Sequence, residues 1–310
     1  MAKQIWAEKY RPKTKEDYVF LDDTLERQFD TWLSEGALPN LLLGGRSGTG
    51  KTSIFWLAMS LMKVHESDIK VINASMETGI DTVREKVLNF IRVFGHGQFK
   101  YVLLDEVDRF SPQAQDSLKN MMEEYMDVAR FCLTSNAPHR ITEAVRGRCQ
   151  EYNFRALPEA EFQMRMLKIL MAEGIEADME TLDAYTKSSH PNLRKCLNML
   201  QQNSTTGKLL MPSSTSANAG PDYLVNVLQL FKTGQTREAR KYLVENARME
   251  DYDEIWTFLY RNLDLWGKTP EQQDTAIEVI RDGMAKQTLV ADKEINLSAT
   301  LVALTRGIGA

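Results

Sequence analysis

The sequence predicts an α/β domain with a five-stranded parallel sheet, followed by a small helical domain and an all-α C-terminal domain. Short apolar runs of strand length alternate with helical segments over the first half of the chain. A glycine-rich loop separates the first of these runs from the helix behind it. Beyond Leu157 only helical periods follow. Alternating strands and helices form a doubly wound parallel sheet covered on both faces.

Strands are expected where apolar residues run together between turn signals. They are predicted at 41–43, 70–73, 98–104 and 130–134, and in a run that ends at Phe154. Helices are expected where apolar residues recur every three or four positions. In the first half of the chain they are predicted over 22–36, 53–59, 79–91 and 111–125. In the second half they are predicted over 162–171, 177–187 and 192–201, and near 224–231, 255–263, 277–284 and 297–304.

Changes in composition predict the domain boundaries. Residues 1–156 form the expected α/β domain and residues 157–205 the small helical domain. Residues 206–221 are rich in Ser, Thr, Gly and Ala, which is typical of a linker. The remaining residues, 222–310, show helical periods only and are expected to form a helical bundle.

Composition narrows the class of protein. The 310 residues are 43% hydrophobic and 26% charged, and no apolar run approaches the roughly 20 residues that a membrane helix needs. With a polar N-terminus, we expect neither a membrane span nor a secretory signal, and a cytoplasmic location. Three cysteines and four scattered histidines without metal-ligand spacing indicate reduced thiols and no transition-metal site. A net charge of −5 neither indicates nor excludes nucleic acid.

The glycine-rich loop is an uninterrupted G-x-x-x-x-G-K-T motif between a strand and a helix. Its glycines allow backbone N–H groups to surround a phosphate, and the helix N-terminus adds partial positive charge. Lys51 is expected to contact the β- and γ-phosphates of ATP, and the Thr52 hydroxyl to bind Mg²⁺. The nucleotide-binding residues are therefore predicted to be Gly45, Arg46, Ser47, Gly48, Thr49, Gly50, Lys51, Thr52 and Ser53.

Polar residues follow two of the predicted strands. Asp105 and Glu106 end the strand over 98–104, at the strand end where open α/β sheets bind ligands. We assign Asp105 to Mg²⁺ and Glu106 to polarising the attacking water; a surface acidic turn is the alternative. Asp108 is interpreted as structural. Asn136 follows the next strand, where it either orients the attacking water or serves as a turn residue.

Five blocks of the chain carry a further signal. They are Trp6-Ala7-Glu8-Lys9-Tyr10-Arg11-Pro12-Lys13-Thr14, Asp105-Glu106-Val107-Asp108, Thr134-Ser135-Asn136, Gly147-Arg148-Cys149 and Asn192-Leu193-Arg194-Lys195-Cys196-Leu197-Asn198. In this order they resemble the N-terminal signature, the acidic box, the first sensor, the S-R-C segment and the second-sensor helix of the AAA+ sliding-clamp loader ATPases, the replication-factor-C-like subunits. The resemblance covers roughly residues 6–201. The resemblance implies an AAA+ phosphate-loop domain, a helical lid and a helical collar that oligomerises.

The chain departs from the family pattern at three places. Arg46-Ser47 replaces a Pro-Pro pair, Gly147 replaces the serine before the finger arginine, and Pro191-Asn192 replaces Gly-Asp. These changes affect loop rigidity and leave the catalytic side chains in place. The short chain and the loose lid favour a bacteriophage version, the large subunit of a phage clamp loader, which would function in the host cytoplasm.

The resemblance implies a ring in which ATP lies between neighbouring subunits. Arg148 would be an arginine finger that reaches the next subunit's γ-phosphate, and Arg194 would contact the γ-phosphate of its own subunit. Tyr10 and Arg11 would lie near the adenine. Without the family context, Arg148 and Arg194 would more often be surface ion-pair partners.

The resemblance also implies the partners: a sliding clamp, primer-template DNA and other loader subunits, identical copies plus one different subunit. A helix beginning near Thr78, Gly79 and Ile80 can bind a DNA phosphate, and Arg84 and Lys86 would follow the same backbone without reading sequence. No membrane partner is expected. The alternatives are another AAA+ DNA ATPase, such as a helicase loader or a branch-migration motor, and a scaffold subunit that binds nucleotide without hydrolysing it.

Overall fold

The computed structural model describes residues 4–20, 22–75, 80–204, 206–212 and 223–306. These residues form two compact units. The first contains the chain up to Glu161 together with Pro191–Arg194, and the second contains Phe162–His190 and the chain from Lys195 onward. Each unit is described by itself.

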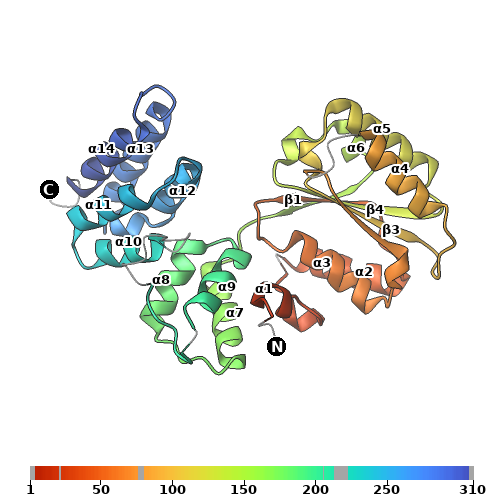
Figure 1. Cartoon of the computed structure of the whole chain (residues 1–310), viewed down its shortest axis with the longest axis horizontal. Coiled ribbons are helices and arrows are strands. Elements are labelled where there is room, and N and C mark those ends of the chain that lie inside the picture. Colours follow the sequence, from red (N-terminus) through yellow and green to blue (C-terminus); the bar gives the residue numbers. More distant parts are fainter. Residues whose placement is uncertain (1–3, 21, 76–79, 205, 213–222, 307–310) are drawn as a thin grey trace. The chain divides into compact units, whose positions relative to one another are not determined.

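The first unit is built on a five-stranded, all-parallel sheet, which confirms the predicted fold class (Figure 1). The strand order is β2-β3-β4-β1-β5, so that β4 lies between β1 and β3. The carboxyl ends of β1, β3 and β4 therefore lie side by side at one edge of the sheet. The strands are β1 (Leu41–Gly45), β2 (Ile69–Asn73), β3 (Lys100–Asp105), β4 (Ala129–Ser135) and β5 (Gln150–Phe154).

Helices cover both faces of this sheet, and successive strand residues supply the two cores. Along β1, Leu42 packs into one core, while Leu41 and Leu43 pack into the other. In Figure 1, α4, α5 and α6 lie on one side of the sheet and α2 and α3 on the other. Their bounds are α2 (Asp23–Glu35), α3 (Lys51–Leu61), α4 (Ile80–Ile91), α5 (Pro112–Glu124) and α6 (Glu143–Arg146).

Local sequence signals account for where these helices begin and end. Asp22 caps α2 by accepting a hydrogen bond from the Leu25 N–H at 2.8 Å, and Gly36 ends the helix in the left-handed region. Ser111 caps α5, with Pro112 as its first residue. The short elements of this unit are α1 (Trp6–Lys9), η1 (Lys15–Asp17), η2 (Glu66–Asp68), η3 (Val107–Arg109) and η4 (Pro138–Arg140).

The described part of the second unit is all-helical, as predicted. One helix was not predicted, α11 (Thr236–Asn246), because its apolar face is reduced to Ala239 and Leu243. None of the helices in the described ranges has the length and apolarity that a bilayer crossing requires. The other helices are α7 (Glu159–Ala172), α8 (Met179–Ser189), α9 (Leu193–Gln202), α10 (Tyr223–Lys232), η5 (Met249–Asp251), α12 (Tyr252–Arg261), η6 (Leu263–Leu265), α13 (Pro270–Lys286) and α14 (Lys293–Arg306).

The predicted linker begins in an ordered segment. Leu209 is buried, and backbone hydrogen bonds join Glu176 to Gly207 and to Leu209, at 3.0 and 2.7 Å. The Tyr185 hydroxyl donates to the Leu210 carbonyl at 2.8 Å. Residues 213–222 lie outside the described residues. The separation of a lid at 157–205 from a collar at 222–310 stays a prediction.

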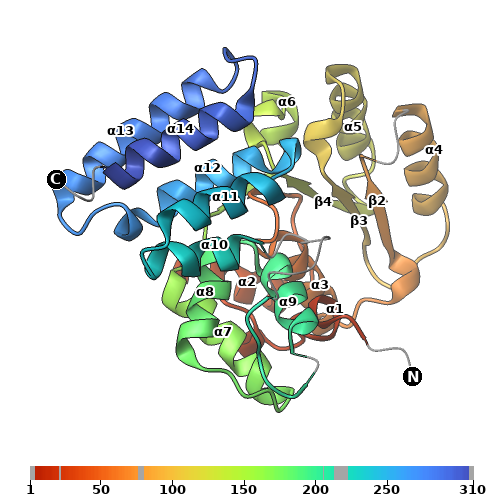
Figure 2. The same cartoon turned by 60° about the vertical axis from the view of Figure 1, so that its left-hand side comes forward.

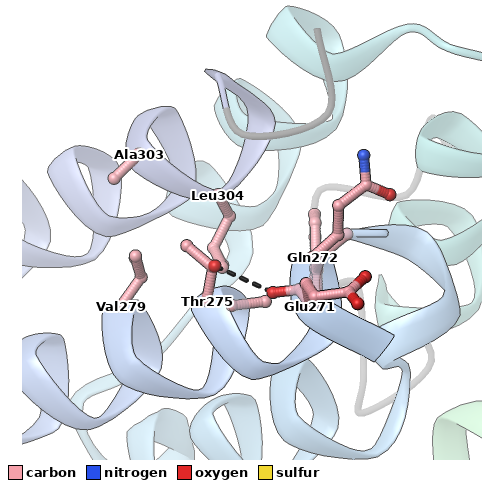
Figure 3. Close-up of a pocket in the computed structure, with 8 residues that line it drawn as sticks. Glu271, Gln272, Thr275, Val279, Ala303 and Leu304 are labelled. Carbon is pink, nitrogen blue, oxygen red and sulfur yellow. Dashed lines mark hydrogen bonds between the residues drawn. The ribbon is translucent and has the colours of Figure 1, made fainter. Parts of the chain in front are cut away.

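A pocket of about 160 Å³ lies between α13 and α14, which run side by side in Figures 1 and 2. A largely apolar cavity of about 150 Å³ can hold a benzene molecule, so this one is the size of a single side chain. The Thr275 hydroxyl at its rim donates to the Glu271 carbonyl at 2.9 Å (Figure 3). The pocket includes none of the predicted site residues. Its lining is Trp266, Glu271, Gln272, Thr275, Ala276, Val279, Ala303 and Leu304.

A buried carboxylate fixes the loop before β3. Asp68 is fully buried and accepts hydrogen bonds from the backbone N–H groups of His96 and Gly97, at 2.7 and 2.8 Å. The Lys100 ammonium lies 3.5 Å from the same carboxylate. Burial alone raises the pKa of Asp68, but the two N–H donors and Lys100 outweigh burial and lower that pKa below its ordinary value. The ionised form therefore stabilises the folded state.

We expect Asp68→Asn to lower the free energy of unfolding by about 3 kcal/mol at pH 7, because it leaves the buried Lys100 charge uncompensated. The folded-state pKa of Asp68 lies below its unfolded value of about 3.9, so its stabilisation is complete above that pH and is lost as the pH falls further. Urea unfolding at pH 7, 5 and 3 should show the gap between wild type and variant narrowing at pH 3. A constant gap would contradict this account.

Candidate active site

The glycine-rich loop connects β1 to α3 as predicted, and its backbone requires glycine. Gly45 has φ +142°, and a Cβ there would lie 2.2 Å from the Phe154 carbonyl oxygen. Gly48 has φ +76°, and a Cβ there would lie 2.1 Å from the Asn192 side-chain oxygen. The Leu193 N–H also donates to the Gly48 carbonyl, at 3.2 Å. The loop is therefore held between β5 and residues 191–194, where only a bare backbone fits.

Lys51, the first residue of α3, has its ammonium group in a polar cage inside the loop. Only 7% of the residue is exposed. Its Nζ donates to the carbonyls of Gly45 and Arg46, both at 2.7 Å, and to Asn136 Oδ1 at 3.0 Å. Burial lowers the Lys51 pKa to about 8, and the nearby carboxylates, Asp105 first, oppose that shift. The site is built to hold a poorly hydrated cation beside negative charge.

The predicted acidic residues lie at the carboxyl end of β3, next to β4. The Thr134 hydroxyl on β4 donates to the Asp105 carboxylate and accepts from the Glu106 N–H at 3.2 Å. One buried hydroxyl thus orients both positions. The Asp108 carboxylate accepts from the Asn136 N–H at 2.9 Å, which matches the structural role expected for it.

Glu106 has a strained backbone. Its φ of +59° and ψ of +43° place it in the left-handed region, where only one other non-glycine residue of the described chain, Lys63, also has a positive φ. A side chain in this region costs roughly 1 kcal/mol or more, and such strain often occurs at functional sites. The strained residue lies at the junction between the end of β3 and the start of η3.

The residues present suit a nucleoside triphosphate and Mg²⁺. The α3 N-terminus and the Lys51 ammonium supply the positive charge that phosphates need. Asp105 and the half-buried Thr52 supply oxygen ligands of the kind that Mg²⁺ prefers. Among the described residues no group of three or more acidic, His or Cys side chains could hold a metal ion. Mg²⁺ suits such a site, because it commonly uses one or two protein ligands plus phosphate and water.

Sequence reasoning missed one residue at the loop. Tyr18 is buried, and its hydroxyl donates to the Gly50 carbonyl at 3.4 Å. Gly50 O also accepts from the N–H groups of Ser53 and Ile54, so Tyr18 contacts the turn that begins α3. Burial raises the pKa of this phenol above its ordinary value, so it stays a neutral donor. No periodicity or motif in the sequence singles out Tyr18.

The predicted arginines lie in different places. Arg194 is exposed, and its charge lowers the pKa of Lys51, although it is a minor cause of that shift. Arg148 follows α6 and pairs with Glu123 of α5. In the described part of the chain, Arg148 makes no hydrogen bond or ion pair with the glycine-rich loop, with Asp105 or with Glu106.

The other predicted contacts are at the chain start and on α4. The Arg11 guanidinium carbon lies 5.9 Å from the ring centroid of Trp56 on α3, and Tyr10 packs edge-on against Trp6. Of the predicted DNA-binding residues, Arg84 and Lys86 are exposed on α4. Thr78 and Gly79 lie outside the described residues, as does the side chain of Ile80.

Comparisons with known proteins agree with this geometry. Residues 41–157 match the model of the ATPase family associated with various cellular activities (AAA). The chain is 35% identical over 251 residues to a replication factor C small subunit from Staphylothermus marinus, covering 79% of this chain and 76% of that protein. The chain belongs to the replication factor C small-subunit family. A member from Pyrobaculum islandicum is 31% identical over 314 residues, covering 98% and 95% of the two chains.

The replication factor C family assignment confirms the resemblance, and with the AAA domain it makes the chain an ATP hydrolase. Two solved structures share the fold alone. Thermotoga maritima RuvB aligns with a TM-score of 0.53 at 12% identity, covering 92% of this chain and 90% of that one. A DNA polymerase III gamma subunit-related protein from the same organism aligns with a TM-score of 0.52 at 14% identity, covering 92% and 99%. The bacteriophage origin stays a prediction.

The shared hydroxyl of Thr134 provides a test of the site. We expect Thr134→Val to lower the ATP turnover number on the order of 10-fold, because Asp105 and Glu106 lose the group that orients them. ATP affinity should change little, since Lys51 and the loop are untouched. Thr186→Val is the matched control, because it also removes a buried hydroxyl, in α8 of the helical unit. Equal turnover in the two variants would show that the Thr134 hydroxyl has no role in hydrolysis.

Proposed function

We propose that the chain is the ATPase subunit of a sliding-clamp loader, which uses ATP binding and hydrolysis to open the clamp and load it on primer-template DNA. The observation that supports this most directly is the convergence of Lys51, Asn136 and the Thr134-linked acidic residues at one edge of the sheet. Family membership supplies the connection to replication.

In this proposal each polar residue at the sheet edge has one task. The Lys51 ammonium exchanges its bonds to the loop carbonyls for the β- and γ-phosphate oxygens of ATP. Glu106 accepts a hydrogen bond from the attacking water, and Asn136, which already contacts Lys51, orients that water. Asp105 and Thr52 would hold Mg²⁺, which neutralises the charge that develops on the phosphates.

Two arginines would complete the site from other elements. Arg148 would act as a finger on the γ-phosphate of a nucleotide held by a neighbouring subunit, since its own loop is not among its partners in the described chain. Arg194 follows Asn192 and Leu193, which contact Gly48 of the loop, and it would contact the γ-phosphate in its own subunit. Tyr10 and Arg11 would border the adenine, next to Trp56 of α3.

DNA and other subunits are the remaining proposed partners. The exposed Arg84 and Lys86 on α4 fit contacts to the phosphate backbone, which are independent of sequence and sensitive to salt. Thr78, Gly79 and Ile80 would bind phosphate at the start of the same helix. The assembly would contain identical copies plus one different subunit, joined by the C-terminal helices, and would function in the cytoplasm.

An apolar patch at the opposite edge of the sheet suits a protein partner. Phe94 is 99% exposed and Val93 62%, in the loop before β3. Met126 and Val128 are also exposed, in the loop before the neighbouring strand β4. The two loops precede neighbouring strands, and exposed aromatic and aliphatic side chains at one end of a sheet are typical of interaction sites. We propose that the sliding clamp docks on this patch.

The first test measures steady-state ATP hydrolysis by the assembled protein with and without primed DNA and a sliding clamp. We expect DNA and clamp together to stimulate the wild type. Glu106→Gln should bind ATP and clamp normally but lose turnover by about 100-fold or more, because it cannot act on the water. Lys51→Ala should lose ATP binding itself.

Three results would contradict the proposal. Unchanged turnover in Glu106→Gln would remove Glu106 from its assigned role. Wild-type protein that binds ATP without hydrolysing it under any of these conditions would favour the nucleotide-binding scaffold, and hydrolysis indifferent to clamp but stimulated by branched DNA would favour a branch-migration motor.

The second test addresses the docking patch. We expect Phe94→Asp to weaken clamp binding by about 10-fold or more, since one well-buried aromatic contact at an interface contributes 2 kcal/mol or more. DNA-independent hydrolysis should not change. Met171→Asp is the matched control, because Met171 is 71% exposed on α7. Clamp affinity that falls equally in both variants, or in neither, would place the docking surface elsewhere.

A further inference from the structure

The proposed finger, Arg148, is held by one specific partner. Its Nε donates to Glu123 Oε1 at 2.9 Å, and its Nη2 contacts the same oxygen. Its Nη1 donates to the Ala144 carbonyl at 2.5 Å. The Nε and Nη2 atoms of the guanidinium thus bind Glu123 of α5, and its Nη1 atom binds the Ala144 carbonyl of α6.

This attachment leaves part of the guanidinium available. A guanidinium has five N–H groups in a fixed planar fork, and three of them are used in the bonds to Glu123 and Ala144. Within the described ranges, the two N–H groups without a bond belong to Nη1 and Nη2, one on each. Phosphate groups are commonly bound by just such a pair of N–H groups. The bond to Glu123 therefore orients the fork without occupying all of it.

The two elements that carry the pair are joined rigidly. The buried Gln115 of α5 donates to the Arg140 carbonyl at 3.1 Å and accepts from the Thr142 N–H at 2.7 Å, just before α6. The Arg148 N–H itself donates to the Val145 carbonyl at 3.1 Å. Glu123 and Arg148 are thus presented from a fixed framework, so that the carboxylate can determine where the long arginine side chain points.

The ion pair is a poor candidate for a purely structural role. About half of the Glu123 side chain and a third of the Arg148 side chain are exposed. Exposed ion pairs contribute little to folding stability. The bond to Arg148 nevertheless lowers the pKa of Glu123, so that the carboxylate is ionised across the neutral range.

We propose that Glu123 is a positioning residue for the finger: it holds the Nε and Nη2 edge of Arg148 and so directs the two remaining N–H groups toward a phosphate bound by the next copy of the chain. This inference rests on the proposed function, because it needs a neighbouring nucleotide. It adds a residue outside the predicted site set, on α5, whereas the finger lies in the turn after α6. Pre-orienting a long side chain raises the rate because less rotamer entropy is lost in the transition state.

The first experiment measures DNA-stimulated ATP hydrolysis by the assembled protein. Glu123→Ala should lower the turnover number on the order of 10-fold, as is typical for residues that orient a catalytic group. Its affinity for a fluorescent ATP analogue should equal that of the wild type, because the variant's own loop is untouched. Glu123→Gln keeps an acceptor oxygen and should recover part of the lost rate.

A second experiment tests whether the effect acts between copies. Lys51→Ala copies cannot bind ATP but carry an intact Arg148 with its Glu123. Glu123→Ala copies bind ATP but present a poorly oriented finger. A mixed assembly should therefore hydrolyse ATP faster than either variant alone, because each Lys51→Ala copy can serve a neighbouring Glu123→Ala copy.

The chain offers a closely matched control. Arg146 and Glu151 form a second exposed pair of the same kind two residues away, with Arg146 Nε and Nη2 at 3.0 and 2.8 Å from Glu151 Oε2. Glu151→Ala breaks that pair without changing Arg148. It should hydrolyse ATP at the wild-type rate.

Three outcomes would overturn the assignment of Glu123. The first is turnover at the wild-type rate in Glu123→Ala. The second is faster turnover in Glu123→Ala, which would show that the ion pair restrains the finger. The third is a mixed assembly that hydrolyses ATP no faster than either variant alone. Arg148→Ala separates this failure from a failure of the proposed function. If Arg148→Ala also hydrolyses ATP normally, the finger itself is wrong. If only that variant is impaired, the finger stands and Glu123 does not position it.

Discussion

The buried ammonium of Lys51 is the interaction on which the rest of the first unit depends. It joins the glycine loop, through the carbonyls of Gly45 and Arg46, to the end of β4, through Asn136. A desolvated cation of this kind is costly unless negative charge surrounds it. Asp105, Glu106 and Asp108 supply that charge from the end of β3. The cluster is therefore arranged to accept an anion, and the phosphates of a nucleotide are the anions that this loop geometry fits.

Strand order makes this cluster possible. Because β4 lies between β1 and β3, residues separated by more than 80 positions in the chain meet at one edge of the sheet. Thr134 uses that position to bond both Asp105 and the backbone of Glu106. Glu106, directly after β3, has a left-handed backbone conformation. A buried hydroxyl and a strained backbone thus give two adjacent acidic residues different local surroundings, which the division of tasks proposed for them requires.

The two ends of the sheet differ in chemistry. The carboxyl ends of the strands hold the nucleotide cluster, and the loops before β3 and β4 expose Phe94 and Met126. Asp68 fixes the first of these loops through the N–H groups of His96 and Gly97. The partly exposed pair of Glu123 on α5 and Arg148 after α6 lies outside this cluster. Rigid parallel strands and paired helices thus connect an internal site with surfaces that suit partners.

The sequence by itself determined the five parallel strands, the glycine loop and the residues Lys51, Asp105, Glu106 and Asn136, because each depends on local periodicity or on a motif of fixed spacing. Helix α11 was not predicted, because its two buried residues, Ala239 and Leu243, are too few to produce a recognisable helical periodicity. Only the tertiary structure decided that Tyr18 reaches Gly50, that Thr134 bridges two acidic positions and that Glu123 holds Arg148. These contacts join segments distant in the chain, and their distances are set by how strands and helices pack, which no local pattern records.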